Sequence, residues 1–392
     1  MPVRNRLAEL HAEIAIWRRH LHQYPELLFD LPLTAQFVED RLHDIGVDDV
    51  VTGLATTGLV AVIHGKTNES GKVIGLRADM DALPIHETSG VAYCSTTPNR
   101  MHACGHDGHT AILLGAAKYL AETRCFDGTA VLIFQPAEEG GAGGQVLCDE
   151  GLMDRWGIQE VYGLHNMPGW PVGHFAIRSG PLMASSDEFD IHVTGYGGHA
   201  AAPHHAIDTT LVASQIVVSL QSVVSRNIDP VKRVALTIGT FKTDSAQSNI
   251  IPHTARLCGT LRTLDPECRT LSMESVERVV DHTAAAFGAS AAISWTPGYP
   301  VTVNHPQQTQ YAIEAACAVA GEAQVDVDVD PILPAEDFSF MLKERPGAYI
   351  FLGNGDSEMC HHPSYIFDDD ALPYGASWFV ELVERRMPAQ GV

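Results

Sequence analysis

The sequence lacks the patterns that mark a membrane, secreted or disordered chain. Its 392 residues contain no stretch approaching the ~20 consecutive apolar residues of a membrane-spanning helix. The opening segment, MPVRNRLAEL, has basic residues but no apolar segment after them, so it is not typical of a signal peptide. Charged residues make up only 19% of the chain, and no run of five like charges occurs. We therefore expect a soluble cytoplasmic protein.

Basic residues are also scarce. Lys and Arg number 25 against 48 Asp and Glu, which gives a formal net charge of −23. Nucleic acid and anionic membrane surfaces both require a basic face, so neither is an expected partner. An anionic small-molecule substrate would have to be held by a few local cations.

The eight cysteines form no CxxC pair and no spacing typical of a small secreted domain. A thiol-redox protein and a disulfide scaffold are thus disfavoured, and in the cytoplasm the cysteines should be free thiols. Most are expected to be small core residues. The 20 histidines, by contrast, exceed the usual share, and several of them are clustered.

Hydrophobic periodicity predicts an α/β domain. Apolar residues recur every three or four positions over 7–21, which indicates an amphipathic helix. Residues 73–76, 130–134 and 161–164 are short apolar runs typical of buried strands, and 109–123 is an alanine- and leucine-rich helix. This alternation favours an α/β domain with a mostly buried sheet, whose active site lies on loops after the strands.

The pattern changes near residue 186. Apolar and polar residues alternate over 189–193, as in a half-exposed strand. The order of expected elements is then βαββαβ, which is typical of a ferredoxin-like α+β sandwich. The α/β pattern resumes after residue 298. We therefore expect a discontinuous catalytic domain, 1–185 and 299–392, with an inserted domain at 186–298. The expected elements of the insertion are a helix at 207–226, strands at 233–239 and 255–262, a helix at 266–287 and a strand at 291–295.

The segment HACGHDGH (102–109) contains five residues with metal-binding or acidic side chains just before a helix. Cys104 and His106, two residues apart on an irregular loop, can point at one centre. Thiolate and imidazole together suit Zn, Mn, Co or Ni, with Zn the best match for sulfur. Alternatively, Asp107 caps the helix and the histidines are structural.

The segment QPAEE (135–139) places two adjacent carboxylates after a buried strand. Neighbouring side chains diverge on extended backbone, so one carboxylate can bind metal while the other acts as a general base. Alternatively, the pair forms a solvated acidic turn. His165 and His362 also follow predicted strands, although either histidine alone is more often structural. Taken together, Cys104, His106, Glu139, His165 and His362 indicate one face with enough ligands for two metal ions.

These motifs carry a family resemblance. The chain resembles the hippurate hydrolase, N-acyl-amino-acid amidohydrolase and auxin-conjugate hydrolase group, within the aminoacylase and carboxypeptidase-type dinuclear metallopeptidases. The resemblance spans nearly the whole chain in order, and it implies a zinc-aminopeptidase-like catalytic domain with a mixed, largely buried sheet. The inserted domain is also the family's architecture. The matching segments are RADMDALP (77–84), MHACGHD (101–107), QPAEE (135–139), GHAAAP (198–203), NIIP (249–252) and AEDF (335–338).

The resemblance implies a set of roles. It implies Glu138 as general base and Asp81 as the aspartate that orients a histidine ligand. Asp79 stands where related peptidases have a metal-binding histidine, so Asp79 is left out of the ligand set. Cys104 stands where they have a bridging aspartate, and it is treated as the bridge. The implied ligands of two divalent ions, Mn or Zn with Co or Ni as alternatives, are Cys104, His106, Glu139, His165 and His362.

The inserted domain resembles the family's lid and dimerisation domain. His199 matches a histidine that comes from the partner subunit and steadies the oxyanion of the tetrahedral intermediate. Asn249 and Arg262 match residues that hold the substrate's α-carboxylate, for which a guanidinium is suited. The resemblance thus implies a homodimer, or a dimer of dimers, built through this domain.

The expected reaction is hydrolysis of an N-acyl amino acid to a carboxylic acid and a free amino acid. A dipeptidase or carboxypeptidase on the same site is the alternative enzyme. A non-catalytic dimeric binding homologue is the alternative of a different class, and the presence of Glu138 with a full set of ligands argues against it. The acyl group, the amino acid and the native metal are left open.

Overall fold

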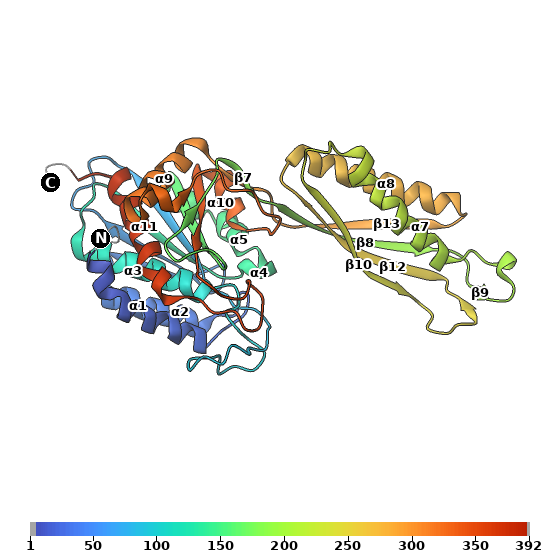
Figure 1. Ribbon diagram of the computed structural model, residues 1–392, viewed down its shortest axis with the longest axis horizontal. Helices are drawn as coiled ribbons and strands as arrows, with labels where there is room; N and C mark the ends of the chain where they lie inside the picture. The colour runs from blue at the N-terminus through green and yellow to red at the C-terminus, as the bar shows by residue number, and fades with distance from the viewer. Residues whose placement is uncertain (1–4, 390–392) are drawn as a thin grey trace. The chain divides into compact units, whose positions relative to one another are not determined.

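The computed structural model describes residues 5–389, which form two compact units. The first unit comprises the chain up to Leu182, together with Val303–Asp330 and the chain from Asp337 onward. The second comprises Met183–Thr302 and Pro331–Glu336. The short Pro331–Glu336 segment was not anticipated in the second unit from the sequence. In Figure 1 the ribbon colour gives the residue number, so the segments of each unit can be located along the chain.

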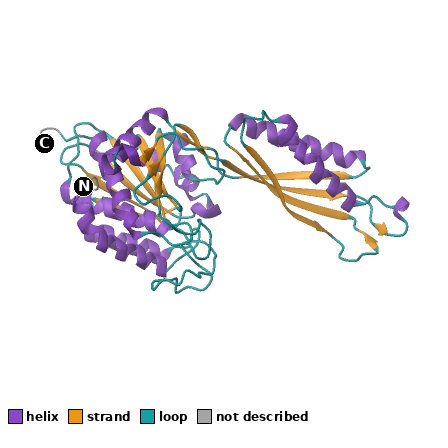
Figure 2. Cartoon of the chain, viewed as in Figure 1, coloured by secondary structure: helices purple, strands orange, loops and turns teal. Residues whose placement is uncertain are grey.

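The first unit is built on an eight-stranded mixed sheet (Figure 2). Its central strands β4, β3, β5 and β16 are parallel to one another. Strands β1 and β2 pair antiparallel with their neighbours, and β6 is antiparallel to β16 but parallel to β15. Every residue of β4 and of β16 is buried, as expected of central parallel strands covered on both faces. The strand order is β1 (Asp49–Leu54), β2 (Gly58–His64), β4 (Thr129–Gln135), β3 (Val73–Asp79), β5 (Glu160–Met167), β16 (Gly347–Gly353), β6 (Phe175–Ala176) and β15 (Val325–Asp326).

Helices cover this sheet. α3 packs against β3 and lies between α1 and α11, while α5 and α10 pack together against strands of the same sheet. The apolar stripe predicted over 7–21 is confirmed, because its members are buried in α1. The helices are α1 (Asn5–Gln23), α2 (Pro32–Ile45), α3 (His106–Thr123), α4 (Glu138–Gly141), α5 (Gly143–Asp149), α6 (Leu152–Arg155), α9 (Pro306–Ala320), α10 (Phe338–Glu344) and α11 (Leu372–Arg386), with short turns η3 (Glu322–Gln324) and η4 (Asp369–Ala371).

The second unit has the element order βαββαβ around a four-stranded antiparallel sheet, β10-β12-β8-β13. This is the topology of a ferredoxin-like sandwich. Inward residues of β8 alternate with outward ones, and α7 and α8 supply the apolar cover. The elements are β8 (Ser185–Thr194), α7 (Thr209–Ser222), η2 (Val223–Asn227), β10 (Val234–Thr243), β12 (Thr254–Thr263), α8 (Pro266–Ala286) and β13 (Ser290–Pro297), with β7 (Gly180–Met183) before them and β14 (Thr302–Asn304) after them.

Local signals explain where these helices begin and end. The Asp208 carboxylate accepts hydrogen bonds from the first turn of α7, and Asp265 does the same for α8, where Pro266 is the first residue. The helix predicted at 207–226 is found as α7 followed directly by a π-helical turn, Val223–Asn227. Among residues 5–389, no helix combines the length and apolar character needed to cross a bilayer.

Candidate metal centre

The loop before α3 is shaped by Gly105. Its φ of 92° lies in the left-handed region, and a Cβ there would lie 2.3 Å from Asn166 Nδ2 and 2.6 Å from Tyr365 Oη. Only glycine fits this position without displacing both side chains. The resulting turn directs Cys104 and His106, both buried, toward the ends of the parallel strands. The alternative of an Asp107 cap is not observed, because Gly105 occupies the N-cap position of α3.

Cys104, His106 and His165 form one group of donors. The Cys104 Sγ lies 3.4 Å from His165 Nε2, and each of the three residues offers a ligand atom within 4.8 Å of the others. The Nδ1 atoms of both histidines donate to backbone carbonyls, His106 to Asp81 at 2.8 Å and His165 to Asn166 at 2.6 Å. This arrangement leaves each Nε2 as the ligand atom, as is usual for metal-binding imidazoles.

The electrostatics of this group favour a bound cation. His106 Nε2 is buried and has no hydrogen-bond partner among the described residues. Burial acts to lower the pKa of His106, but the carboxylates of Asp79 and Asp81 outweigh it and raise the pKa to about 10. Burial, together with the neighbouring His109, lowers the pKa of His165 to about 3. The residues therefore fit a metal ion, whose charge would replace the proton on His106.

Glu138 and Glu139 stand at the end of β4, where the chain turns sharply. Ala137 has a φ of 57° and Glu139 has non-helical backbone angles, so the two carboxylates do not follow a regular helix. Asp81 fixes this turn, because its two carboxylate oxygens accept from the backbone N–H groups of Glu138 at 2.9 Å and Glu139 at 3.0 Å. Asp81 thereby holds both the Glu138–Glu139 turn and, through its carbonyl, His106. The acidic turn is not a solvated one, since Glu138 is buried.

Glu139 links two donor groups. It belongs to one group with His106 and Glu138, and to another with Cys104 and His361. Its Oε1 lies 3.1 Å from His361 Nε2. Burial acts to raise the pKa of Glu139, but His361 and His106 outweigh it, so the carboxyl pKa is lowered. An ionised carboxylate between two sets of imidazole and thiol donors is suited to bind cations.

The assignment of His362 as a ligand requires a correction. His361 is the histidine that lies against Glu139, whereas His362 belongs to none of the donor groups found among residues 5–389. The His361 backbone has a φ of 71°, and its N–H donates to Ala103 O at 2.7 Å, which holds it beside the Cys104 loop. His362 is exposed and accepts from Ser364 N. The turn thus directs His361 toward Glu139 and His362 away from it, although both histidines are exposed.

Asp79 contacts side chains beside the Cys104, His106 and His165 donor group. Its Oδ1 lies 2.6 Å from His109 Nδ1, and its Oδ2 accepts from Arg77 at 2.7 Å. The distance from Asp79 Oδ2 to His106 Nε2 is 3.8 Å. Burial acts to raise the pKa of Asp79, but His106, Arg77 and His109 hold it well below its usual value. Both oxygens are thus engaged in positioning. The role of His109 was not identified from the sequence, although its i, i+3 spacing from His106 on α3 was visible.

Known proteins resemble this chain in sequence and in fold. The profile of Peptidase family M20/M25/M40 matches residues 75–385. The hippurate hydrolase of Campylobacter jejuni is 40% identical over 96% of this chain and 97% of its own length. The N-acetyl-L-cysteine deacetylase of Bacillus subtilis is 40% identical over 97% of this chain and 89% of its own. The chain belongs to peptidase family M20/M25/M40. It is an enzyme that hydrolyses amide bonds.

A solved structure supports the fold of this M20-family hydrolase. It is a Bacillus subtilis protein described as a dinuclear metal-binding peptidase of family M20, 32% identical, with a TM-score of 0.85. The alignment covers 97% of this chain and 99% of that one. A metal centre is therefore in keeping with both the donor groups described above and the family.

In the second unit of the hydrolase, His199 and Asn249 lie close together. His199 in β9 (Gly198–His199) pairs with Ile250 in β11 (Ile250–Ile251), and the next residue, Ala200, donates its N–H to Asn249 O at 3.0 Å. Both residues are exposed. This pair of short strands continues beyond the Thr254 end of β12 (Figure 1). The structure thus brings together two of the three residues predicted in this unit.

Arg262 lies at the opposite end of β12. It is eight residues from Thr254, a separation of roughly 27 Å along an antiparallel strand. It pairs in register with Ala235 and Ser186 and is half-buried. Burial lowers the pKa of its guanidinium, with Glu188 and Asp187 opposing that effect. One copy of the second unit therefore does not place Arg262 beside His199 and Asn249.

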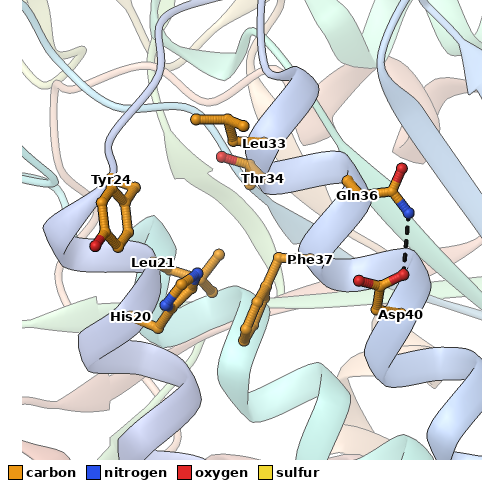
Figure 3. Close-up of a pocket in the computed structure, with 8 residues that line it drawn as sticks. All are labelled: His20, Leu21, Tyr24, Leu33, Thr34, Gln36, Phe37 and Asp40. Atoms are coloured by element: carbon orange, nitrogen blue, oxygen red, sulfur yellow. Dashed lines mark hydrogen bonds between the residues drawn. The ribbon is translucent and has the colours of Figure 1, made fainter.

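A cavity of about 400 Å³ lies between α1 and α2 of the hydrolase (Figure 3). The rings of His20 and Phe37 stack within it, and Gln36 donates to Asp40. None of the residues assigned to the metal centre lines it. The lining residues are His20, Leu21, Tyr24, Leu33, Thr34, Gln36, Phe37 and Asp40.

Proposed function

We propose that this enzyme hydrolyses N-acyl amino acids to a carboxylic acid and a free amino acid with the help of two divalent metal ions. One observation carries the proposal: thiol, imidazole and carboxylate donors, of which Cys104 and His106 are buried, converge beside the buried Glu138. Relatives named hippurate hydrolase and N-acetyl-L-cysteine deacetylase support an N-acyl amino acid as the substrate. The ligands we propose are Cys104, His106, Glu139, His165 and His361, with His361 in place of His362.

These residues suit Mn or Zn, with Co and Ni as alternatives, and the thiol favours Zn. When bound, such ions polarise the amide carbonyl and make water a better nucleophile at neutral pH. In their absence, the hydrogen bond with Cys360 and burial raise the pKa of the Cys104 thiol well above its usual value. A cation at this position would reverse that shift and favour the thiolate.

Glu138 is the general base of the proposal. It is buried, Asp81 fixes its backbone, and its Oε1 accepts from Asp337 N at 3.4 Å. Its carboxylate takes the proton from the attacking water and returns it to the amide nitrogen as the C–N bond breaks. Asp81 acts by positioning, because it holds both the Glu138 turn and His106.

We further propose that the active unit is a dimer formed through the second unit, with His199 steadying the oxyanion and Asn249 and Arg262 holding the substrate carboxylate. His199 and Asn249 lie together beyond the Thr254 end of β12, whereas Arg262 is roughly 27 Å from Thr254 along that strand. The three residues can serve one substrate only if they come from two chains. His199 and Asn249 would then come from the partner, and Arg262 from the chain that carries the metal centre.

We propose that the enzyme acts in the cytoplasm. All eight cysteines are free thiols, as expected in a reducing compartment. A carboxypeptidase or dipeptidase acting at the same centre is the rival activity, since it would cleave the same kind of bond beside a carboxylate.

An activity panel tests the proposal. The metal-free protein is supplied with Mn, Zn, Co or Ni and assayed with hippurate, N-acetyl amino acids, indole-acetyl conjugates and free-amine dipeptides. We expect at least one N-blocked amino acid to be cleaved faster than every dipeptide, and only with metal. Preferential turnover of free-amine dipeptides would favour the rival activity. Full activity after exhaustive chelation would contradict the role of the metals.

A further inference from the structure

Cys104 lies near a second thiol, that of Cys360, which the proposed mechanism does not use. Cys360 lies 256 residues further along the chain, and its Sγ is 3.9 Å from the Cys104 carbonyl oxygen. Each thiol shifts the pKa of the other, upward for Cys104 and downward for Cys360. The backbones are also joined, because His361 N donates to Ala103 O at 2.7 Å. Two segments from distant parts of the sequence are therefore held together with the Cys360 thiol beside Cys104.

The surroundings of the two thiols differ. Cys104 is 8% exposed, while Cys360 is partly exposed and precedes the exposed His361 in an irregular loop. An oxidant arriving from solvent reaches Cys360 first, and the buried Cys104 is positioned to react next. A loop outside regular secondary structure can also adjust to the Cα separation that a disulfide requires. The Cys258 thiol provides a contrast, since it donates to Asp190 rather than meeting another sulfur.

We propose that Cys104 and Cys360 form a peroxide-sensitive dithiol, and that its oxidation to a disulfide withdraws Cys104 from the metal centre. The second half of this inference rests on the proposed function, in which Cys104 is a metal ligand. The first half rests on the position of the Cys360 thiol beside Cys104 and on the backbone bond that joins their loops. Oxidation of the pair is then a reversible modification that switches the enzyme off by excluding a metal ion.

The oxidant is hydrogen peroxide. The Cys360 thiolate attacks one peroxide oxygen and the O–O bond breaks, which gives a sulfenic acid and, with the thiol's proton, water. The Cys104 thiol then loses its proton as its sulfur attacks the sulfenic sulfur, the S–S bond forms, and hydroxide leaves and takes that proton as water. Two thiols and one hydrogen peroxide give one disulfide and two waters. A disulfide sulfur has no thiolate charge to offer, so metal binding and the disulfide exclude each other.

The test uses the full-length protein in metal-free and Zn-loaded forms, treated with a small excess of hydrogen peroxide. Unreduced peptides are mapped by mass spectrometry, and bound zinc is measured before and after dithiothreitol. We expect a Cys104–Cys360 link in the metal-free protein and loss of zinc uptake that dithiothreitol restores. In the Zn-loaded protein the link should form at least about tenfold more slowly, because a metal-bound thiolate is not free to react.

Two variants make the test specific. Cys360→Ser retains zinc uptake and activity, but its Cys104 forms no disulfide and its zinc uptake becomes insensitive to reversible oxidation. Cys317→Ser removes a thiol from α9 and should respond to peroxide as the wild type does. Absence of the Cys104–Cys360 link in metal-free wild-type protein overturns the dithiol, whatever the zinc measurements show. A link that leaves zinc uptake intact overturns the exclusion of metal and removes Cys104 from the proposed ligands.

Discussion

Glu138 and Glu139 are neighbours in the chain but have different surroundings. Both belong to the donor group with His106, but Glu139 also lies against His361 and shares a group with Cys104, whereas Glu138 accepts from the backbone N–H of Asp337. This difference supports the proposed roles of Glu139 as ligand and Glu138 as base, which the sequence EE alone does not separate. The resemblance assigned the roles, and the local contacts give them a physical basis.

Glu138→Gln should therefore keep the fold and the metal but lose turnover. The amide preserves the size of the side chain and cannot accept a proton, so kcat should fall by about 10²–10⁴. Metal content by elemental analysis and steady-state kinetics on an N-acyl amino acid are the measurements. Activity above a tenth of that of the wild type, with metal retained, would remove Glu138 from the role of base.

His361 and His362 offer a matched comparison within one turn. His361→Ala removes a proposed ligand, whereas His362→Ala removes an exposed ring that accepts from Ser364 N. Loss of a partner outside the ligand set already costs roughly 10–100-fold in metal affinity, and loss of a ligand should cost at least as much. Competition with a metallochromic chelator gives the affinities. A larger loss in His362→Ala than in His361→Ala would restore the sequence-based assignment.

At the scale of elements, periodicity predicted much of the fold and less of the site. The stripe in α1 and the βαββαβ order of the second unit follow from burial, which acts over whole elements and leaves a repeating pattern. The choice of His361 over His362 depends on one positive φ in an irregular loop, where no period exists. His109 likewise acts through Asp79, a contact between α3 and β3 that spacing along the chain does not encode.

The contact between α1 and α3 depends on buried charge. His22 Nδ1 lies 2.8 Å from Asp107 Oδ2, and its Nε2 lies 3.2 Å from Glu87 Oε1. Burial acts to lower the pKa of His22, but Asp107 and Glu87 outweigh it and raise the pKa to about 9. Because this exceeds the unfolded value of about 6.5, charged His22 stabilises the fold fully below about pH 6.5. That stabilisation is lost as the pH rises through about 9.

Replacing His22 should reduce this pH dependence. His22→Gln cannot become charged, so its stability should change less than that of the wild type between pH 6.5 and pH 9.5. The difference should reach up to about 3 kcal/mol, as the shift in pKa implies. Urea unfolding at several pH values measures it, and His43→Gln, which alters an exposed histidine of α2, is the control. Parallel stability curves for wild type and His22→Gln would contradict the assigned charge.

At the scale of the whole molecule, the question is how many chains build one active site. His199 and Asn249 lie together at one end of the second unit, and Arg262 lies at the other end of β12. An enzyme that uses all three on one substrate needs two chains, and a two-fold interface supplies the same residues to both sites. The proposed chemistry therefore requires a dimer. This requirement can be tested by mixing chains that carry different inactivating substitutions.

The last prediction concerns the activity of mixtures of inactive variants. His199→Ala and Glu138→Gln homodimers should each be nearly inactive, since an oxyanion donor contributes roughly 10²–10³ and a base about 10²–10⁴ to turnover. In a mixed dimer, one site combines an intact Glu138 with the partner's intact His199, so activity should return to up to about half of wild type per mixed dimer.

His199→Ala mixed with Arg262→Ala should also recover activity, because one site then has both residues intact. His199→Ala mixed with Asn249→Ala should not recover, because both residues come from the same chain and each site lacks one of them. Subunit exchange is confirmed by native mass spectrometry. Exchange without recovery in the first mixture would show that His199 acts within its own chain or not at all, and recovery in the third would show that His199 and Asn249 do not act as a pair.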